Sequence, residues 1–184
     1  MSDWTDVPLF HIDVPCSGEG EALPEQRRVE SSTSLSITDK ERARFRKNIV
    51  KSPSCWFWIG AISTPDGYGR FTWQRGGKQR TVLAHRFALE LEGFSTVGVI
   101  AEHFCNEPLC VRVDEHHVFA STQSDNIRYA VTLGRHRGNR RTIAHGLLPA
   151  ERSMRIRQAL QHGWDEERFY SAISPGPLDQ PTLF

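Results

Sequence analysis

Two kinds of hydrophobic pattern alternate along the chain, and together they predict an α+β fold. Apolar residues at helical spacing follow Thr38, and "TDKE" has the spacing of a capping box, so we expect a helix from Thr38 to near Lys51, before Pro53. Short aromatic and β-branched runs between glycine-containing turns then predict strands at "CWFWIGA", "GYGRFTW" and "RTVLA".

The remaining pattern predicts further helices around a pair of strands. "AHRFALELEG" indicates a short helix that ends at Gly93. "VGVIAEH" and "HVFAS" indicate strands, and "TQSDNIRYAVTLG" indicates a helix with Thr122 as N-cap and Gly134 as its stop. Two more helices are expected, one over "PAERSMRIRQALQHG" ending at Gly163 and one over "DEERFYSAI" capped by Asp165. The middle of the chain is therefore predicted to run strand, loop, strand, helix.

Composition divides the chain into four regions. Its 184 residues suit one domain, but a hydrophobic content of 38% is low and predicts that some segments are disordered. We expect a polar, acidic, disordered segment over 1–36, a folded domain over 37–140, a helical extension over 141–174 and a flexible tail over 175–184. The extension resembles the opening pair of a helix-turn-helix unit without its recognition helix, so a packing role is an equal expectation.

The charge of the chain is distributed unevenly. The net charge is +1, yet residues 1–30 hold seven acids and two arginines, and residues 126–157 hold eight arginines and one glutamate. A basic segment favours a polyanion such as DNA as partner, and the alternative is a solvated arginine-rich helix face. The sequence shows neither an apolar run that could cross a membrane nor a secretory signal, so we expect a cytoplasmic protein. In a reducing compartment its four cysteines indicate metal ligands or spare thiols.

Potential metal ligands concentrate in the loop between the paired strands. Cys105 and Cys110 are five positions apart, and His117 lies seven further on. Cys55 opens an upstream strand and could complete a Cys3His zinc tetrahedron, whereas Cys16 lies in the polar segment and is a poor candidate. The alternative is that the loop cysteines are ordinary buried thiols.

Zinc binding leaves two nearby polar residues unexplained. His103 ends the first of the paired strands, and Asn126 lies in the first turn of the helix that follows the second. Such a pair suits phosphodiester hydrolysis, because an imidazole can accept a proton from water while an amide oxygen helps to hold a divalent cation. The alternative is a structural His–Asn pair.

The motifs "HFCNEPLCV" and "HHVFASTQSDN" resemble those of the HNH endonucleases, which have the ββα-metal fold. The sequence is most similar to the phage and bacterial branch of this family and is also similar to the His-Cys box homing endonucleases. The resemblance covers about residues 38 to 138, because the upstream motifs "CWFWIGA", "GYGRF" and "AHRFALELEG" stand in the order found in that branch. It implies that His103 is the general base and that Asn126 binds a catalytic Mg²⁺ or Mn²⁺. It also implies a structural zinc, whose ligands would be Cys55, Cys105, Cys110 and His117.

The chain departs from the family pattern after the second loop cysteine. Arg112 and Val113 stand where the family often has Asn-Pro, and the loop to the histidine is longer. The choice between His116 and His117 as zinc ligand therefore stays open, with His117 favoured by its distance to Asn126 and by the apolar pair that follows it.

Other residues receive supporting roles. Glu102 is a candidate second ligand of the catalytic metal, because an acid precedes this histidine in some relatives, and Arg86 or Arg128 is a candidate phosphate clamp. Phosphate contacts on DNA are expected from the arginines that follow the predicted helix, Arg135, Arg137, Arg140 and Arg141.

Residues 180–184, "QPTLF", resemble the short peptide by which bacterial polymerases and repair proteins dock on the DNA sliding clamp. Gln180, Leu183 and Phe184 would be its anchors, and the alternative is that the apolar pair packs on its own domain. The sequence thus predicts a zinc-stapled ββα-metal endonuclease, phage-encoded or bacterial and nucleoid-associated, that nicks or cuts DNA with little sequence preference or is directed by a partner. Alternatives are a non-catalytic zinc-stapled DNA-binding module and an RNA-cleaving nuclease.

Overall fold

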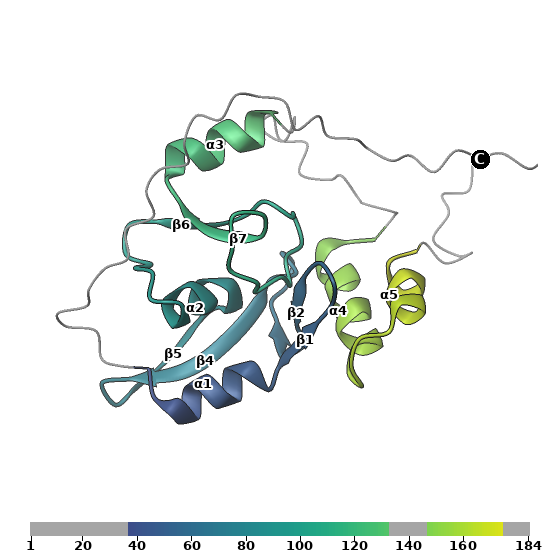
Figure 1. The fold of residues 1–184 in the computed structure, drawn as a ribbon, viewed down its shortest axis with the longest axis horizontal. Coiled ribbons are helices and arrows are strands. Elements are labelled where there is room, and N and C mark those ends of the chain that lie inside the picture. Colours follow the sequence, from purple (N-terminus) through teal and green to yellow (C-terminus); the bar gives the residue numbers. More distant parts are fainter. Residues whose placement is uncertain (1–36, 133–146, 175–184) are drawn as a thin grey trace, which may run out of the picture.

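Helices and short antiparallel strands are combined in the computed structural model, which describes residues 37–132 and 147–174 (Figure 1). The helices are α1 (Asp39–Arg46), α2 (Ala84–Leu91), α3 (Gln123–Thr132), α4 (Pro149–Ala159) and α5 (Glu166–Ile173). The strands are β1 (Ile49–Lys51), β2 (Trp56–Trp58), β3 (Ala61–Ile62), β4 (Gly69–Arg75), β5 (Lys78–Leu83), β6 (Ile100–His103) and β7 (Val118–Ser121). They form three small sheets, β1–β2, β3–β4–β5 and β6–β7, so the predicted α+β class is confirmed.

The capping box predicted for α1 is present, but the helix is shorter than predicted. The Thr38 hydroxyl accepts a hydrogen bond from the Glu41 N–H at 3.2 Å, and the Glu41 carboxylate accepts one from the Thr38 N–H at 3.0 Å. The helix ends at Arg46, and the expected continuation to Lys51 was wrong, because the following residues form β1. The two β-branched residues of β1 lie opposite aromatic residues of β2, a pairing that stabilises a strand more than a helix end.

An aromatic cluster fills the space between α1, α2 and the β3–β4–β5 sheet. The ring of Phe45 from α1 lies 4.9 Å from that of Trp58 and 4.9 Å from that of Phe87, measured between centroids. Phe71 of β4 closes the group at 4.5 Å from Phe87. This packing fixes α2, whose N-terminal end carries part of the site described below.

The order strand, loop, strand, helix predicted for the middle of the chain is confirmed as β6, loop, β7 and α3. The strands pair antiparallel, with His103 opposite Val118. The hydroxyl of Thr122 accepts the Asp125 N–H at 3.1 Å, as expected of the N-cap of α3. In Figure 1, α2 lies between the β4–β5 hairpin and the β6–β7 hairpin, and α3 lies on the far side of β6–β7.

Helices α4 and α5 belong to the same folded body as the sheets. The Asp165 side chain caps α5 as predicted, accepting the Arg168 N–H at 2.9 Å, and α4 stops at Ala159, before the expected Gly163. Both helices contribute to a second apolar cluster, which consists of Cys55, Phe57, Leu109, Cys110, Ile156 and Leu160, with Trp164, Phe169 and Ile173 packed against it. Within the ranges that the structure describes, no helix has the length and apolar character needed to span a membrane.

Candidate metal centre and catalytic histidine

Three cysteine side chains from two distant parts of the chain meet in the apolar cluster to which α4 contributes. The sulfur atoms of Cys55, Cys105 and Cys110 all lie within 4.8 Å of one another, and none of the three is in a disulfide. Cys55 and Cys110 are buried and Cys105 is half-buried. Thiolates grouped in this way are suited to a soft or borderline metal such as zinc. The structure thus brings together three of the four zinc ligands predicted from the sequence.

Backbone pairing explains how the cysteines come together. Cys55 directly precedes β2, and β2 runs antiparallel to the loop around Cys110, where the Trp58 N–H donates to the Leu109 carbonyl at 2.8 Å. The Ser52 hydroxyl accepts the Cys55 N–H at 3.0 Å and so closes a turn before the strand. Strand pairing therefore brings Cys55 to the loop that carries Cys105 and Cys110.

The pKa values of the three thiols depend on one another, because the sulfur atoms are joined by hydrogen bonds. Hydrogen bonds from Cys110 and Cys55 lower the pKa of Cys105, so this sulfur loses its proton first. The hydrogen bond to Cys105 raises the pKa of both Cys55 and Cys110, and burial raises it further. Complete deprotonation would place three negative charges side by side in the core, an arrangement that a bound divalent cation would stabilise.

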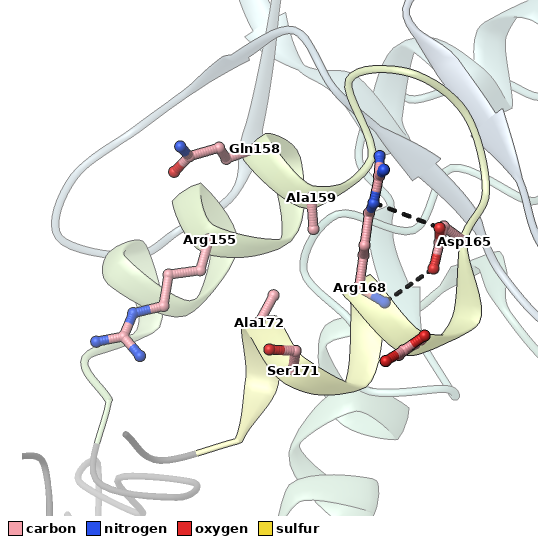
Figure 2. A pocket seen from close by; sticks show the side chains of 8 residues that line it. Arg155, Gln158, Ala159, Asp165, Arg168, Ser171 and Ala172 are labelled. Carbon is pink, nitrogen blue, oxygen red and sulfur yellow. Dashed lines mark hydrogen bonds and ion pairs between the residues drawn. The ribbon is translucent and has the colours of Figure 1, made fainter. Parts of the chain in front are cut away.

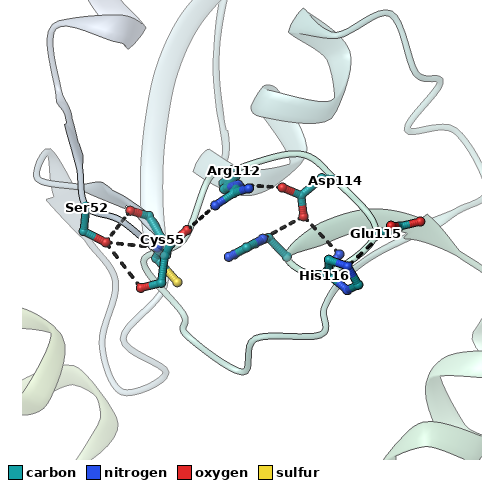
Figure 3. Close-up of polar contacts among 8 residues, drawn as sticks. Ser52, Cys55, Arg112, Asp114, Glu115 and His116 are labelled. Carbon is teal, nitrogen blue, oxygen red and sulfur yellow. Dashed lines mark hydrogen bonds and ion pairs between the residues drawn. The ribbon is translucent and has the colours of Figure 1, made fainter. Parts of the chain in front are cut away.

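His117, the fourth predicted zinc ligand, is held by a carboxylate and is not part of the thiol group. Its Nδ1 lies 2.6 Å from Oδ1 of Asp114, and its side chain is only 10% exposed. Its carbonyl accepts the Phe104 N–H at 2.8 Å, which places it beside the residue that precedes Cys105. His116 instead faces solvent with a side chain that is 72% exposed and lies next to Glu115 (Figure 3). Of the two histidines left open by the sequence, His117 is the buried one, and its ring is oriented by a carboxylate.

The hydrogen bonds around Asp114 explain why its carboxyl group is ionised. Burial acts to raise the pKa of Asp114, but hydrogen bonds from the His117 side chain, the His116 N–H and Arg112 outweigh it and lower the pKa below its ordinary value. The Arg112 Nε donates to Oδ2 of Asp114 at 2.5 Å. Figure 3 shows Arg112 and Asp114 facing each other. An ionised carboxylate has only acceptor atoms, so the hydrogen between it and His117 belongs to the imidazole Nδ1.

His103 is held in a defined orientation next to the thiols. Its Nε2 lies 2.9 Å from the carbonyl oxygen of Cys110. A carbonyl can only accept, so Nε2 carries the hydrogen and Nδ1 keeps a lone pair. Burial lowers the pKa of His103 below its ordinary value, while the hydrogen bond to Cys110 and the charges of Cys105 and Glu107 act in the opposite direction. The imidazole is thus neutral near pH 7 and able to accept a proton.

A second histidine, His85, contacts His103 and was missed from the sequence. It is the second residue of α2, is 3% exposed, and its ring centroid lies 4.4 Å from that of His103. Tyr68 contacts both rings, at 5.3 Å from His85 and 5.9 Å from His103. Burial lowers the pKa of His85 well below its ordinary value, and its Nδ1 has no hydrogen-bond partner among the residues that the structure describes. The sequence offered one signal, since His85 stands among the apolar residues Ala84, Phe87, Ala88 and Leu89 of the predicted helix.

The predicted ligands of a catalytic cation lie in the same ββα unit. Asn126 is half-buried in the first turn of α3, where its N–H donates to the Thr122 carbonyl at 3.0 Å. Glu102 precedes His103 on β6 and is 6% exposed, and its Oε1 is buried without a partner in the described part of the chain. No hydrogen bond between described residues joins Glu102 to Asn126. A buried carboxylate oxygen without a hydrogen-bond partner is available to bind a cation.

The two arginines proposed as phosphate clamps differ in accessibility. Arg86 donates to the carbonyls of Thr96 at 2.5 Å and Val99 at 3.3 Å, so its guanidinium holds the segment that leads into β6. Arg128 is 72% exposed and contacts Asp125 at 3.2 Å. Arg128 is therefore the one whose side chain remains accessible to a phosphate, and Arg86 has a structural task that the sequence did not indicate.

Searches for relatives add nothing to this geometry. No family model, no curated protein and no solved structure matches the chain. The interpretation of the site therefore depends on its own residues.

Several predicted functional residues lie outside the described residues. These are the arginines expected to contact DNA, Arg135, Arg137, Arg140 and Arg141, and the expected clamp-binding anchors, Gln180, Leu183 and Phe184. The acidic segment over 1–36, which includes Cys16, and the tail over 175–184 lie outside them as well.

A hollow with a volume of about 600 Å³ lies between α4 and α5 but contains none of the predicted site residues (Figure 2). Its charged lining is largely neutralised within the helices, since Arg168 contacts Asp165 at 3.4 Å and Arg155 contacts Glu151 at 2.8 Å. None of the described side chains around His103 or the thiols contributes to this hollow.

Proposed function

We propose that the chain is a metal-dependent endonuclease of the ββα-metal type that hydrolyses phosphodiester bonds in DNA. The observation that carries this proposal is the orientation of His103: its Nε2–H donates to the Cys110 carbonyl, which leaves Nδ1 as the basic nitrogen. The residue ends β6 of a strand–loop–strand–helix unit in which Asn126 lies in the first turn of the helix. A neutral imidazole held in this way keeps on Nδ1 the lone pair that a general base requires.

In the proposed reaction, Nδ1 of His103 accepts a proton from the attacking water. The imidazolium that forms is stabilised by the Cys110 carbonyl and by the negative charges of Cys105 and Glu107. Asn126 and Glu102 would hold Mg²⁺ or Mn²⁺, and such a cation supplies charge stabilisation at the leaving oxygen. Arg128 is the accessible arginine for a phosphate oxygen.

The proposal assigns the thiol group a structural role. Cys55, Cys105 and Cys110 would bind zinc with His117 as fourth ligand, a Cys3His set that suits a closed tetrahedral site. Because Cys110 also supplies the carbonyl that orients His103, the zinc loop would fix the position of the general base. Binding free energy at this site would contribute directly to folding.

DNA is the proposed substrate because of the arginine-rich sequence between 126 and 157. The proposal also includes the "QPTLF" segment, whose resemblance to clamp-binding peptides suggests recruitment by a bacterial sliding clamp. Recruitment of this kind would raise the local concentration of an enzyme that has little sequence preference of its own.

Cleavage of supercoiled plasmid tests the proposal. The protein should convert plasmid to nicked or linear forms in Mg²⁺ or Mn²⁺ and lose this activity in EDTA. His103→Ala should reduce the rate by at least the ~10²–10⁴-fold typical of a lost general base while DNA binding persists. His116→Ala is the matched control, because this exposed histidine lies on the same loop and should leave the rate unchanged.

The outcomes separate the rival functions. Binding of DNA without cleavage of any substrate by the wild type would favour the zinc-stapled binding module. Cleavage of a labelled RNA but not of plasmid would favour the RNA-cleaving nuclease. Parental activity in His103→Ala would show that His103 is not the base.

A further inference from the structure

The segment in which the chain departs from the HNH pattern contains a carboxylate with several donors around it. Asp114 accepts hydrogen bonds from Arg112 Nε at 2.5 Å, from the His116 N–H at 3.0 Å and from His117 Nδ1 at 2.6 Å (Figure 3). Three donors on one partly buried carboxylate define the position of its two oxygens closely. The imidazole of His117 is thereby fixed in one tautomer and one orientation.

A second hydrogen bond of Arg112 extends this network to the turn before β2, which carries the Cys55 thiol. Its NH1 group donates to the carbonyl of Ser54 at 2.7 Å, and Ser54 immediately precedes Cys55. The backbone closes the same loop, since the Val118 N–H donates to the Arg112 carbonyl at 2.9 Å. Arg112 and Asp114 therefore connect His117 to the backbone next to Cys55.

We propose that Asp114, supported by Arg112, is the positioning residue of the metal centre: it holds His117 with Nδ1 protonated, so that Nε2 is the nitrogen available to the metal ion. The inference rests on the proposed zinc site. A carboxylate that accepts the outer N–H of a metal-binding histidine fixes the ring and raises its basicity as a ligand. The additional residues of this loop, which make it longer than the family pattern, thus supply the orienting group.

The neighbouring pair offers an internal comparison. Glu115 and His116 also lie next to each other, at 3.4 Å, but their side chains are 64% and 72% exposed. A solvated pair of this kind contributes little to orientation, because water competes for both groups. The same loop therefore carries Asp114, which is expected to raise the affinity for the metal by orienting His117, and Glu115, which is expected to leave that affinity unchanged.

The test measures zinc affinity in the full chain by competition with a chromophoric chelator, with zinc content determined by elemental analysis. Asp114→Ala should bind zinc about 10–100-fold more weakly than the wild type. Asp114→Asn should show a smaller loss, because its amide oxygen can still accept the Nδ1–H. Glu115→Ala is the matched control and should bind zinc like the wild type. Replacement of zinc by Co²⁺ adds a spectroscopic signature, in which Asp114→Ala should keep and His117→Ala should lose the band pattern of the wild-type ligand set.

Each result decides one point. If the wild type holds no zinc, the metal site itself is wrong; if the wild type holds zinc and Asp114→Ala holds it equally well, only the role of Asp114 is wrong. An equal loss of affinity in Asp114→Ala and Glu115→Ala would also contradict the proposal, because it would indicate a general disturbance of the loop. If Asp114→Ala does not fold, as judged by circular dichroism, Asp114→Asn decides, and wild-type affinity in that variant would overturn the inference.

Discussion

At the scale of single residues, His103 depends on neighbours from three separate elements for its orientation. Cys110 supplies the hydrogen-bond acceptor, while Tyr68 and His85 cover the ring. The buried Nδ1 of His85, which lacks a partner among the described residues, is costly to keep, roughly 1–3 kcal/mol for an unsatisfied polar atom. Polar groups that are retained at such a cost are concentrated at functional sites.

His85→Leu tests whether the imidazole of His85 takes part in the reaction. Leucine fills a similar volume and removes the unsatisfied nitrogen, so the thermal unfolding temperature should stay the same or rise. Plasmid cleavage should slow by about tenfold or more through kcat, with KM little changed, because the orientation of His103 and the polarity beside it are altered. A stable variant that cleaves at the parental rate would show that His85 has only a packing role.

Sequence spacing was sufficient to find residues that lie in one loop, and insufficient for those that meet across elements. The motif around Cys105 and Cys110 pointed correctly to a group of thiols, because both lie within a few residues of each other and Cys55 opens a recognisable aromatic strand. His85 and Asp114 were missed. The importance of His85 depends on a contact with His103 that arises only when α2 packs against β6. Asp114 lies only three positions before His117 in the same loop, but spacing alone does not show which polar neighbour its carboxylate contacts.

At the scale of elements, local signals predicted helix starts better than helix ends. The caps at Thr38, Thr122 and Asp165 depend on residues three positions apart, so the sequence contains the whole interaction. The end of α1 was misplaced because β1 is stabilised by pairing with β2, which lies beyond the reach of a local pattern. Tertiary pairing overrides local preference at that point.

The loop that carries Cys105 and Cys110 is joined to α4 by a nearly buried ion pair. Arg152 contacts Glu107 at 2.8 Å, and the Glu107 side chain is 8% exposed. Arg152→Ala should lower the free energy of unfolding by about 2–3 kcal/mol, because it leaves a buried carboxylate without its partner. Arg168→Ala, which removes an exposed ion pair on α5, should cost no more than about 1 kcal/mol. Equal losses in chemical denaturation would contradict this account.

At the scale of the whole molecule, two separate apolar clusters form the core of the described residues. The first contains the aromatic residues around Phe45 and supports the sheet and α2. The second surrounds Cys55 and Cys110 and is completed by α4 and α5, which come from the far end of the described chain. The sequence predicted these helices and allowed them a packing role, but it could not indicate that they cover the thiols, since that contact joins residues about a hundred positions apart.

Leu160 and Leu89 allow the roles of the two clusters to be compared. Leu160 is fully buried in the cluster around the thiols, whereas Leu89 of α2 is equally buried but lies outside that cluster. Truncation of either side chain to alanine should cost about 2–5 kcal/mol of stability, because both leave a cavity in a packed core. Only Leu160→Ala should also make the cysteines react faster with a thiol reagent and release zinc more readily, since it opens the cover over the site. If both variants expose their thiols at the same rate, global unfolding rather than local cover controls access, and α4 and α5 stabilise the molecule without shielding its thiol group.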